Sequence, residues 1–128
     1  MLTIHAAWVL LVAFGLSFAY ETWRMLARRE VSVHDTPAEW RKGLVIYAIA
    51  AAVIFALFAG LPGSAWIGLA LSLAFVLIST FYYNPVVMRD RSPGVVDWVE
   101  DILFTGLIFV AAWILALHLL GFELSRTG

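Results

Sequence analysis

The sequence predicts an all-α membrane protein in which four transmembrane helices form an antiparallel, up-and-down bundle. Hydrophobic residues make up 63% of the 128 residues and charged residues only 13%, and the mean hydropathy is +0.94. Soluble domains carry about 25% charged residues. Four apolar segments contain no Lys, Arg, Asp or Glu: Leu2–Tyr20, Leu44–Leu61, Ala65–Tyr83 and Ile102–Phe122. Each is close to the ~20 residues that a helix needs to cross a bilayer.

We expect these helices to form a single domain over 1–128, with spans at about 2–22, 40–61, 65–83 and 98–122. The second helix should begin near Pro37, because Thr36, Pro37 and Glu39 fit a capping box with proline at the first helical position. The Ser-Pro pair at 92–93 gives the fourth helix a similar start. No proline lies inside any expected span, so no interrupted helix is predicted.

The distribution of Lys and Arg predicts how the bundle is oriented. Seven of the eight cations lie in the segments 21–43 and 84–101. Loops rich in Lys and Arg face the cytoplasm, so both termini should lie on the outer side of a bacterial or archaeal cytoplasmic membrane. A secretory signal peptide is the alternative for the first segment, because Ser-Phe-Ala at 17–19 resembles a cleavage site. The arginines follow that segment instead of preceding it, which favours a transmembrane helix.

Aromatic residues gather near the ends of the expected spans. Those at the inner ends are Tyr20, Trp23, Trp40, Tyr82, Tyr83 and Trp98, and Trp66 lies at an outer end. Such rings anchor helices at the membrane interface. We therefore expect anchoring rather than ligand stacking.

The second and third helices carry small residues at every fourth position. These are Ala48, Ala52, Ala56 and Gly60 on the second helix, and Ser64, Gly68 and Ser72 on the third. Small residues at this spacing let helix backbones approach closely in lipid. With only the segment 60–64 between them, the two helices should form a tight hairpin. Alternatively, one of the two series forms the interface of a homo-oligomer.

A charged cluster on the inner side contains the candidate site residues. Asp97, Glu100 and Asp101 share one face at the start of the fourth helix, and Glu21 and Arg24 lie near the end of the first. In one interpretation these groups pair with each other or dock a partner. In the other they are catalytic, with Asp97 and Asp101 holding Mg²⁺ and Arg24 binding a phosphate.

Two histidines are expected near the outer face, His5 at the start of the first helix and His118 near the end of the fourth. If those helices are neighbours, the imidazoles could bind a metal or ligate a haem. Alternatively, they hydrogen-bond water or lipid headgroups. The chain has no cysteine, which excludes disulfides and thiolate ligands, and the sequence names no cofactor.

One short stretch resembles a known family. Tyr-Asn-Pro at 83–85 and Val-Glu-Asp at 99–101 resemble the small membrane-bound carotenoid cyclases, in which a Pro-x-Glu-Glu/Asp motif enters an aromatic-rich helix. Trp98 stands where that motif has proline, and the aspartate expected in the preceding helix is missing. The resemblance covers residues 83–105 and implies that Glu100 and Asp101 are acid catalysts.

Three functions follow from these features. The first is a non-enzymatic subunit or homo-oligomeric component that packs with other membrane helices and presents a charged cytoplasmic face. The second is an enzyme that modifies a lipid or isoprenoid at the inner interface, and the third is an oligomeric channel or facilitator. The expected partners are membrane lipids and either another membrane protein or further copies of the chain. The net charge of −1 gives no footprint for nucleic acid.

Overall fold

All the long elements of the chain are helices. The computed structural model describes residues 2–27, 37–88 and 94–121. Its elements are α1 (Leu2–Ala27), α2 (Pro37–Ala59), α3 (Ser64–Ile78), the π-helix η2 (Ser79–Met88), which continues α3, and α4 (Val95–Leu119). Four helical stretches, the third being α3 extended into η2, are long and apolar enough to span a membrane. This confirms the predicted all-helical class and its four candidate spans.

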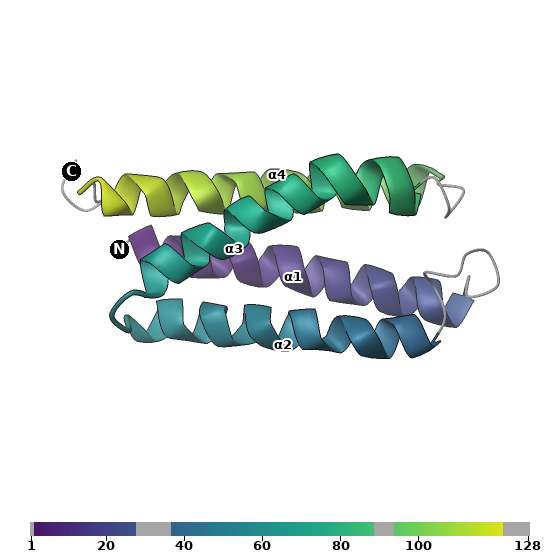
Figure 1. Cartoon of the computed structure of the whole chain (residues 1–128), viewed down its shortest axis with the longest axis horizontal. Helices are drawn as coiled ribbons and strands as arrows, with labels where there is room; N and C mark the ends of the chain where they lie inside the picture. The colour runs from purple at the N-terminus through teal and green to yellow at the C-terminus, as the bar shows by residue number, and fades with distance from the viewer. Residues whose placement is uncertain (1, 28–36, 89–93, 122–128) are drawn as a thin grey trace.

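Figure 1 shows how the helices are arranged. The start of α1, the end of α4 and the α2–α3 turn lie at one end of the bundle, the terminal end. The opposite end, called the charged end here, holds the last turn of α1 and the first turns of α2 and α4, with Arg24, Glu39 and Asp97. Helix α1 packs against α4 and α2, and α3 packs against α4. Contact between α2 and α3 is less extensive, because α3 starts beside the end of α2 and then rises away from it (Figure 1).

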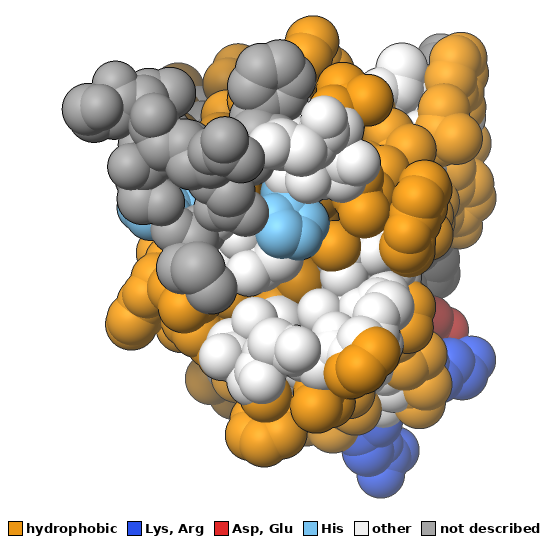
Figure 2. Space-filling model, turned by 90° about the vertical axis from the view of Figure 1, so that its left-hand side faces the viewer, with side chains coloured by type: hydrophobic (Ala, Val, Ile, Leu, Met, Phe, Trp, Pro, Cys, Tyr) orange, Lys and Arg blue, Asp and Glu red, His pale blue; other side chains and the backbone are white. Residues whose placement is uncertain are grey.

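Side chains from all four α-helices fill the interior between them. Leu10, Leu57, Ile108 and Leu115 are completely buried there. Large apolar side chains also cover the outside, as the end-on view in Figure 2 illustrates. Phe55 on α2 is 69% exposed and Ile102 on α4 is 66% exposed. A surface of this kind suits lipid, because soluble proteins rarely expose large contiguous apolar areas.

The helix starts follow from local capping. Helix α2 begins at Pro37, as the sequence predicts, although its expected cap Thr36 lies outside the described residues. Helix α4 begins at Val95 with Gly94 as N-cap, two residues after the start at Pro93 that the Ser-Pro pair at 92–93 predicts and three residues before the expected span. The Asp97 carboxylate accepts a hydrogen bond from the Gly94 backbone N–H (2.7 Å). A criterion that selects only apolar residues leaves out this first turn, because the turn contains Asp97. An acidic residue in the first turn is favoured by the helix dipole.

The third span differs from the prediction. Its α-helix ends at Ile78 and continues from Ser79 to Met88 as a π-helix that contains Pro85, so the helical stretch is longer than the expected span 65–83 but is not interrupted. Proline removes a backbone donor and clashes with the preceding turn of an α-helix. Local π-helical adjustment is one way in which transmembrane helices accommodate it.

The expected α2–α3 hairpin uses only one of the two series of small residues. Ser64, Gly68 and Ser72 of α3 are buried, and a Cβ on Gly68 would lie 3.0 Å from Leu115 and 3.1 Å from Leu57. The α3 series therefore allows close packing on α4 as well as α2. The series on α2 does not face α3: Ala48, Ala52 and Gly60 are exposed.

Candidate functional site

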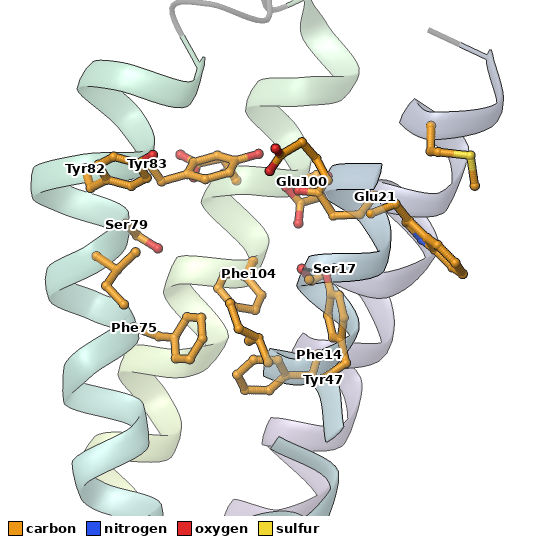
Figure 3. A pocket seen from close by; sticks show the side chains of 17 residues that line it. Phe14, Ser17, Glu21, Tyr47, Phe75, Ser79, Tyr82, Tyr83, Glu100 and Phe104 are labelled. Carbon is orange, nitrogen blue, oxygen red and sulfur yellow. Dashed lines mark hydrogen bonds between the residues drawn. The ribbon is translucent and has the colours of Figure 1, made fainter. Parts of the chain in front are cut away.

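A cavity of about 290 Å³ lies between the helices near the charged end (Figure 3). Helices α1, α2, α3 and α4 and the π-helix η2 all contribute to its wall. Its size is at the lower end of the range for small-molecule sites, about 300–1,000 Å³. The cavity follows from the divergence of α3 and η2 from α2, because helices that separate leave space that side chains do not fill.

The deep part of the cavity is aromatic. Phe14, Phe75 and Phe104 come from α1, α3 and α4 and meet edge to face. Their ring centroids are 5.1 Å apart for Phe14–Phe75, 5.4 Å for Phe14–Phe104 and 6.2 Å for Phe75–Phe104. Beside them, the hydroxyl groups of Ser17 and Tyr47 share a hydrogen bond (2.8 Å). The three phenylalanine rings form an apolar inner wall of the cavity, and their relative orientation is well defined because edge-to-face aromatic pairs favour one geometry.

The part of the cavity nearer the charged end is acidic. The carboxylates that line it are those of Glu21 on α1, Glu39 on α2, and Glu100 and Asp101 on α4. Glu100 and Asp101 are only 7% and 5% exposed. In Figure 3 the side chains of Glu100 and Tyr83 point toward one another across this part of the cavity. The polar groups in this part of the cavity are therefore carboxylates and phenol hydroxyls, and they lie next to the aromatic rings.

Asp101 is held by the π-helix. With the Asn84 amide oriented as its neighbours require, the amide nitrogen donates to both oxygens of Asp101, each at 2.9 Å. Asn84 thus joins η2 to α4.

Asp97 and Arg24 form a separate, structural pair. The Arg24 guanidinium donates to Asp97 Oδ1 at 3.1 Å, and the two side chains are 0% and 1% exposed. The Tyr20 hydroxyl donates to the same oxygen. This pair joins the end of α1 to the start of α4, as the predicted pairing of charges requires. Neither residue lines the cavity, so the predicted site residues separate into a lining set, Glu21, Glu100 and Asp101, and this structural pair.

Among the described residues, the fold brings no further ligand group to the side chains proposed to bind a metal or a haem. Within residues 2–27, 37–88 and 94–121, no group of three or more His, Asp or Glu side chains is placed to hold a metal ion. The Asp97 carboxylate expected to bind Mg²⁺ already accepts from Arg24, Tyr20 and Gly94. His5 and His118 lie at the terminal end of the packed helices α1 and α4, away from the cavity.

Several cavity residues are absent from the predicted site. The three phenylalanines are apolar residues in apolar helices, so nothing in the sequence distinguishes them from core residues. Tyr82, Tyr83 and Trp40 were expected to be interfacial anchors, yet all three line the cavity. Tyr20, also expected there, is buried against Asp97. The sequence does contain one signal for the altered helix that carries Tyr82 and Tyr83. The proline of Tyr-Tyr-Asn-Pro lies at the end of an apolar run, and a proline in that place predicts a change in helix geometry.

No protein-family profile, curated protein or solved structure matches this chain. The resemblance to carotenoid cyclases therefore receives no support from a family match. Of the residues that it concerns, Glu100 and Asp101 line the cavity, whereas Trp98 does not. The class that the fold defines is a small multi-pass membrane protein with four candidate transmembrane helices.

Proposed function

We propose that this protein binds an amphipathic molecule, taken from the surrounding membrane, in the cavity between its helices. The observation that carries the proposal is the composition of the cavity wall. Carboxylates line one part, and the packed rings of Phe14, Phe75 and Phe104 line the other. A largely apolar pocket with a few convergent polar groups is the usual form of a small-molecule site.

The side of the cavity between α2 and the α3–η2 segment supplies an entrance. Ile46 on α2 and Ile78 and Tyr82 on α3–η2 line the cavity and are 45%, 44% and 51% exposed. A side chain that is both lining and exposed marks the point where the cavity meets the outside. In a bilayer this outside is lipid, so an apolar ligand can enter sideways without crossing water.

The orientation inferred from Lys and Arg places this site at the inner leaflet. With the cation-rich segments 21–43 and 84–101 in the cytoplasm, the charged end faces the cytoplasm and both termini face outward. The chain then crosses a bacterial or archaeal cytoplasmic membrane four times in an up-and-down order.

Binding is better supported than acid catalysis. The Asn84 amide donates to both oxygens of Asp101, so this carboxyl group already has a structural partner. Arg24, the expected phosphate ligand, is fully buried against Asp97. A lipid-modifying enzyme would need the same cavity, and binding is the step that both functions share.

Packing with another membrane protein or with a second copy stays a prediction, and so does a channel formed between subunits. The exposed small residues Ala48 and Ala52 of α2, with Gly60 just after its end, are where a partner helix would approach most closely. Cysteine crosslinking from position 52 in membranes would test this.

A pair of neighbouring substitutions tests ligand binding. Ser79 is 4% exposed and lines the cavity, whereas the adjacent Thr80 is exposed and does not line it. Ser79→Phe should fill the cavity, and Thr80→Phe should leave it open. We expect mass spectrometry of protein purified in mild detergent to find a small amphiphile with the wild type and with Thr80→Phe, but not with Ser79→Phe. The same set of molecules with all three proteins would contradict the proposal.

A further inference from the structure

We propose that the part of the ligand held inside this cavity is a compact system of about two fused rings, and that any extended chain stays outside in the lipid. This inference rests on the proposed function and specifies the class of ligand. Its first argument is the depth of the cavity, which ends at Phe14, Phe75 and Phe104 (Figure 3). One turn further toward the terminal end, Leu10 on α1 and Ile108 on α4 are completely buried in the core. The apolar part of a ligand therefore stops at the three rings.

The second argument is the volume of the cavity. An apolar cavity of ~150 Å³ is large enough to bind benzene. The cavity between these helices has a volume of about 290 Å³, so it holds a group about twice the size of benzene. Two fused rings with a small polar substituent have that size, whereas a membrane lipid with its acyl chains is several times larger. A long chain on the ligand would have to leave through the opening at Ile46, Ile78 and Tyr82.

The third argument is the aromatic character of the wall. Seven of the 17 described residues that line the cavity are Phe, Tyr or Trp. The planes of the three phenylalanine rings lie at 89°, 87° and 80° to one another, so the inner wall can offer either an edge or a face to a bound ring. Aromatic rings attract one another edge to face or in offset stacks. A ring system can therefore make contacts with this wall that an alkyl chain cannot make.

A rigid ring system also loses little conformational freedom when it binds. An alkyl chain held wholly inside this cavity would have to fold back on itself, because the inner wall closes the deep end. Ordering a flexible ligand opposes binding, and a rigid ligand avoids most of that loss. The closed depth, the volume and the wall thus all favour a compact ring over a chain.

Four neutral alcohols that differ only in their apolar part test the inference: benzyl alcohol, naphthalenemethanol, anthracenemethanol and decanol. Each would be titrated calorimetrically into the purified full chain in mild detergent, with detergent alone as the blank, because such alcohols also enter micelles. We expect saturable binding of the first two, with naphthalenemethanol bound about tenfold more tightly because its second ring buries more apolar surface. Anthracenemethanol and decanol should neither bind saturably nor displace naphthalenemethanol.

Phe75→Ala should change this selectivity in a defined way. The substitution removes one ring from the inner wall, so anthracenemethanol, which is larger than naphthalenemethanol by one ring, should now bind. Phe81→Ala is the matched control, because it makes the same change on the same α3–η2 segment at a side chain that is 73% exposed and does not line the cavity. It should keep the wild-type order of affinities.

Failure of folded Phe75→Ala to bind anthracenemethanol would overturn the inferred limit on depth. The comparison of the four alcohols on the wild-type protein does not depend on the folding of either variant. Saturable binding of decanol that Ser79→Phe abolishes would show that the cavity is a binding site but does not select a compact ring.

The remaining outcomes separate the two proposals. If none of the four alcohols binds while an amphiphile still accompanies the wild-type protein, the inferred ring system fails alone. If none of them binds and no amphiphile accompanies the protein, the proposed function fails, and the size and shape inferred for the ligand fail with it.

Discussion

At the scale of single residues, Asp97 shows how a buried charge can be part of a membrane helix. Its carboxylate accepts from the Tyr20 hydroxyl, the Arg24 guanidinium and the Gly94 N–H. Two donors on α1 and one at the N-cap of α4 replace the water molecules that would hydrate this carboxylate at a protein surface. Because the pair is hydrogen-bonded and buried, removing one member costs the other a buried ion pair.

Substitutions at this pair should therefore be strongly non-additive. Asp97→Asn should destabilise the protein by about 3–5 kcal/mol, because the buried Arg24 loses its ion pair with Asp97. The double variant Arg24→Met/Asp97→Asn removes both charges and keeps an acceptor for Tyr20 and Gly94, so it should regain most of that loss. Thermal unfolding in detergent measures both. Additive losses in the double variant would mean that the ion pair does not hold α1 to α4.

Asn84 has a comparable role at the cavity. Asn84→Leu removes two hydrogen bonds to the Asp101 carboxylate, and bonds to a charged group contribute about 1.5–3 kcal/mol. Asn84→Asp has the same shape but places a second carboxylate against the first. It should destabilise the protein more than Asn84→Leu does at neutral pH. The order of the two unfolding temperatures is the measurement, and the reverse order would refute the assigned hydrogen bonds.

At the scale of helices, α3 and η2 have different requirements. Helix α3 needs small side chains where it crosses α2 and α4, and Gly68 lies at the closest approach. The π-helix η2 leaves the α-helical register around Pro85 and brings Ser79, Tyr83 and Asn84 to the cavity or to Asp101. Short π-helical segments often occur at functional sites.

Two glycines test the close approach of α3. At Gly68 a Cβ would lie 3.0 Å from Leu115 and 3.1 Å from Leu57, whereas at Gly106 on α4 nothing lies within 4 Å. Gly68→Ile should destabilise the bundle by about 1–3 kcal/mol through overpacking. Gly106→Ile should have little effect, or stabilise α4 slightly, since glycine is unfavourable inside a helix. Equal unfolding temperatures for the two variants would contradict this packing.

At the scale of the whole molecule, the cavity is a consequence of helix directions. Helix α1 packs between α2 and α4, while α3 follows α4 and leaves α2 toward the charged end. The space so formed lies beside the carboxylates of the first turns of α4.

The orientation of the molecule can be tested directly, because the chain has no cysteine. A single cysteine at Lys42 should react with a membrane-impermeant maleimide only after the cells are permeabilised. A single cysteine at Pro62, in the α2–α3 turn, should react in intact cells. Labelling of Lys42→Cys in intact cells would place the cation-rich segments outside and reverse the inferred topology.

The sequence by itself determined the features that depend on composition and local order. Apolar length set the four candidate spans, and Pro37 set the start of α2. Each of these depends on neighbours in the chain or on the solvent. A one-dimensional pattern therefore contains them.

Only the tertiary structure decided which residues meet. Phe14, Phe75 and Phe104 are far apart in the sequence and resemble their apolar neighbours, and their contact depends on the angles at which three helices cross. The separation of Asp97 from Glu100 and Asp101 is decided in the same way, because three positions on one helix face different neighbours once α1 and η2 are in place. Crossing angles result from packing summed over the whole bundle, which no local segment of the sequence contains.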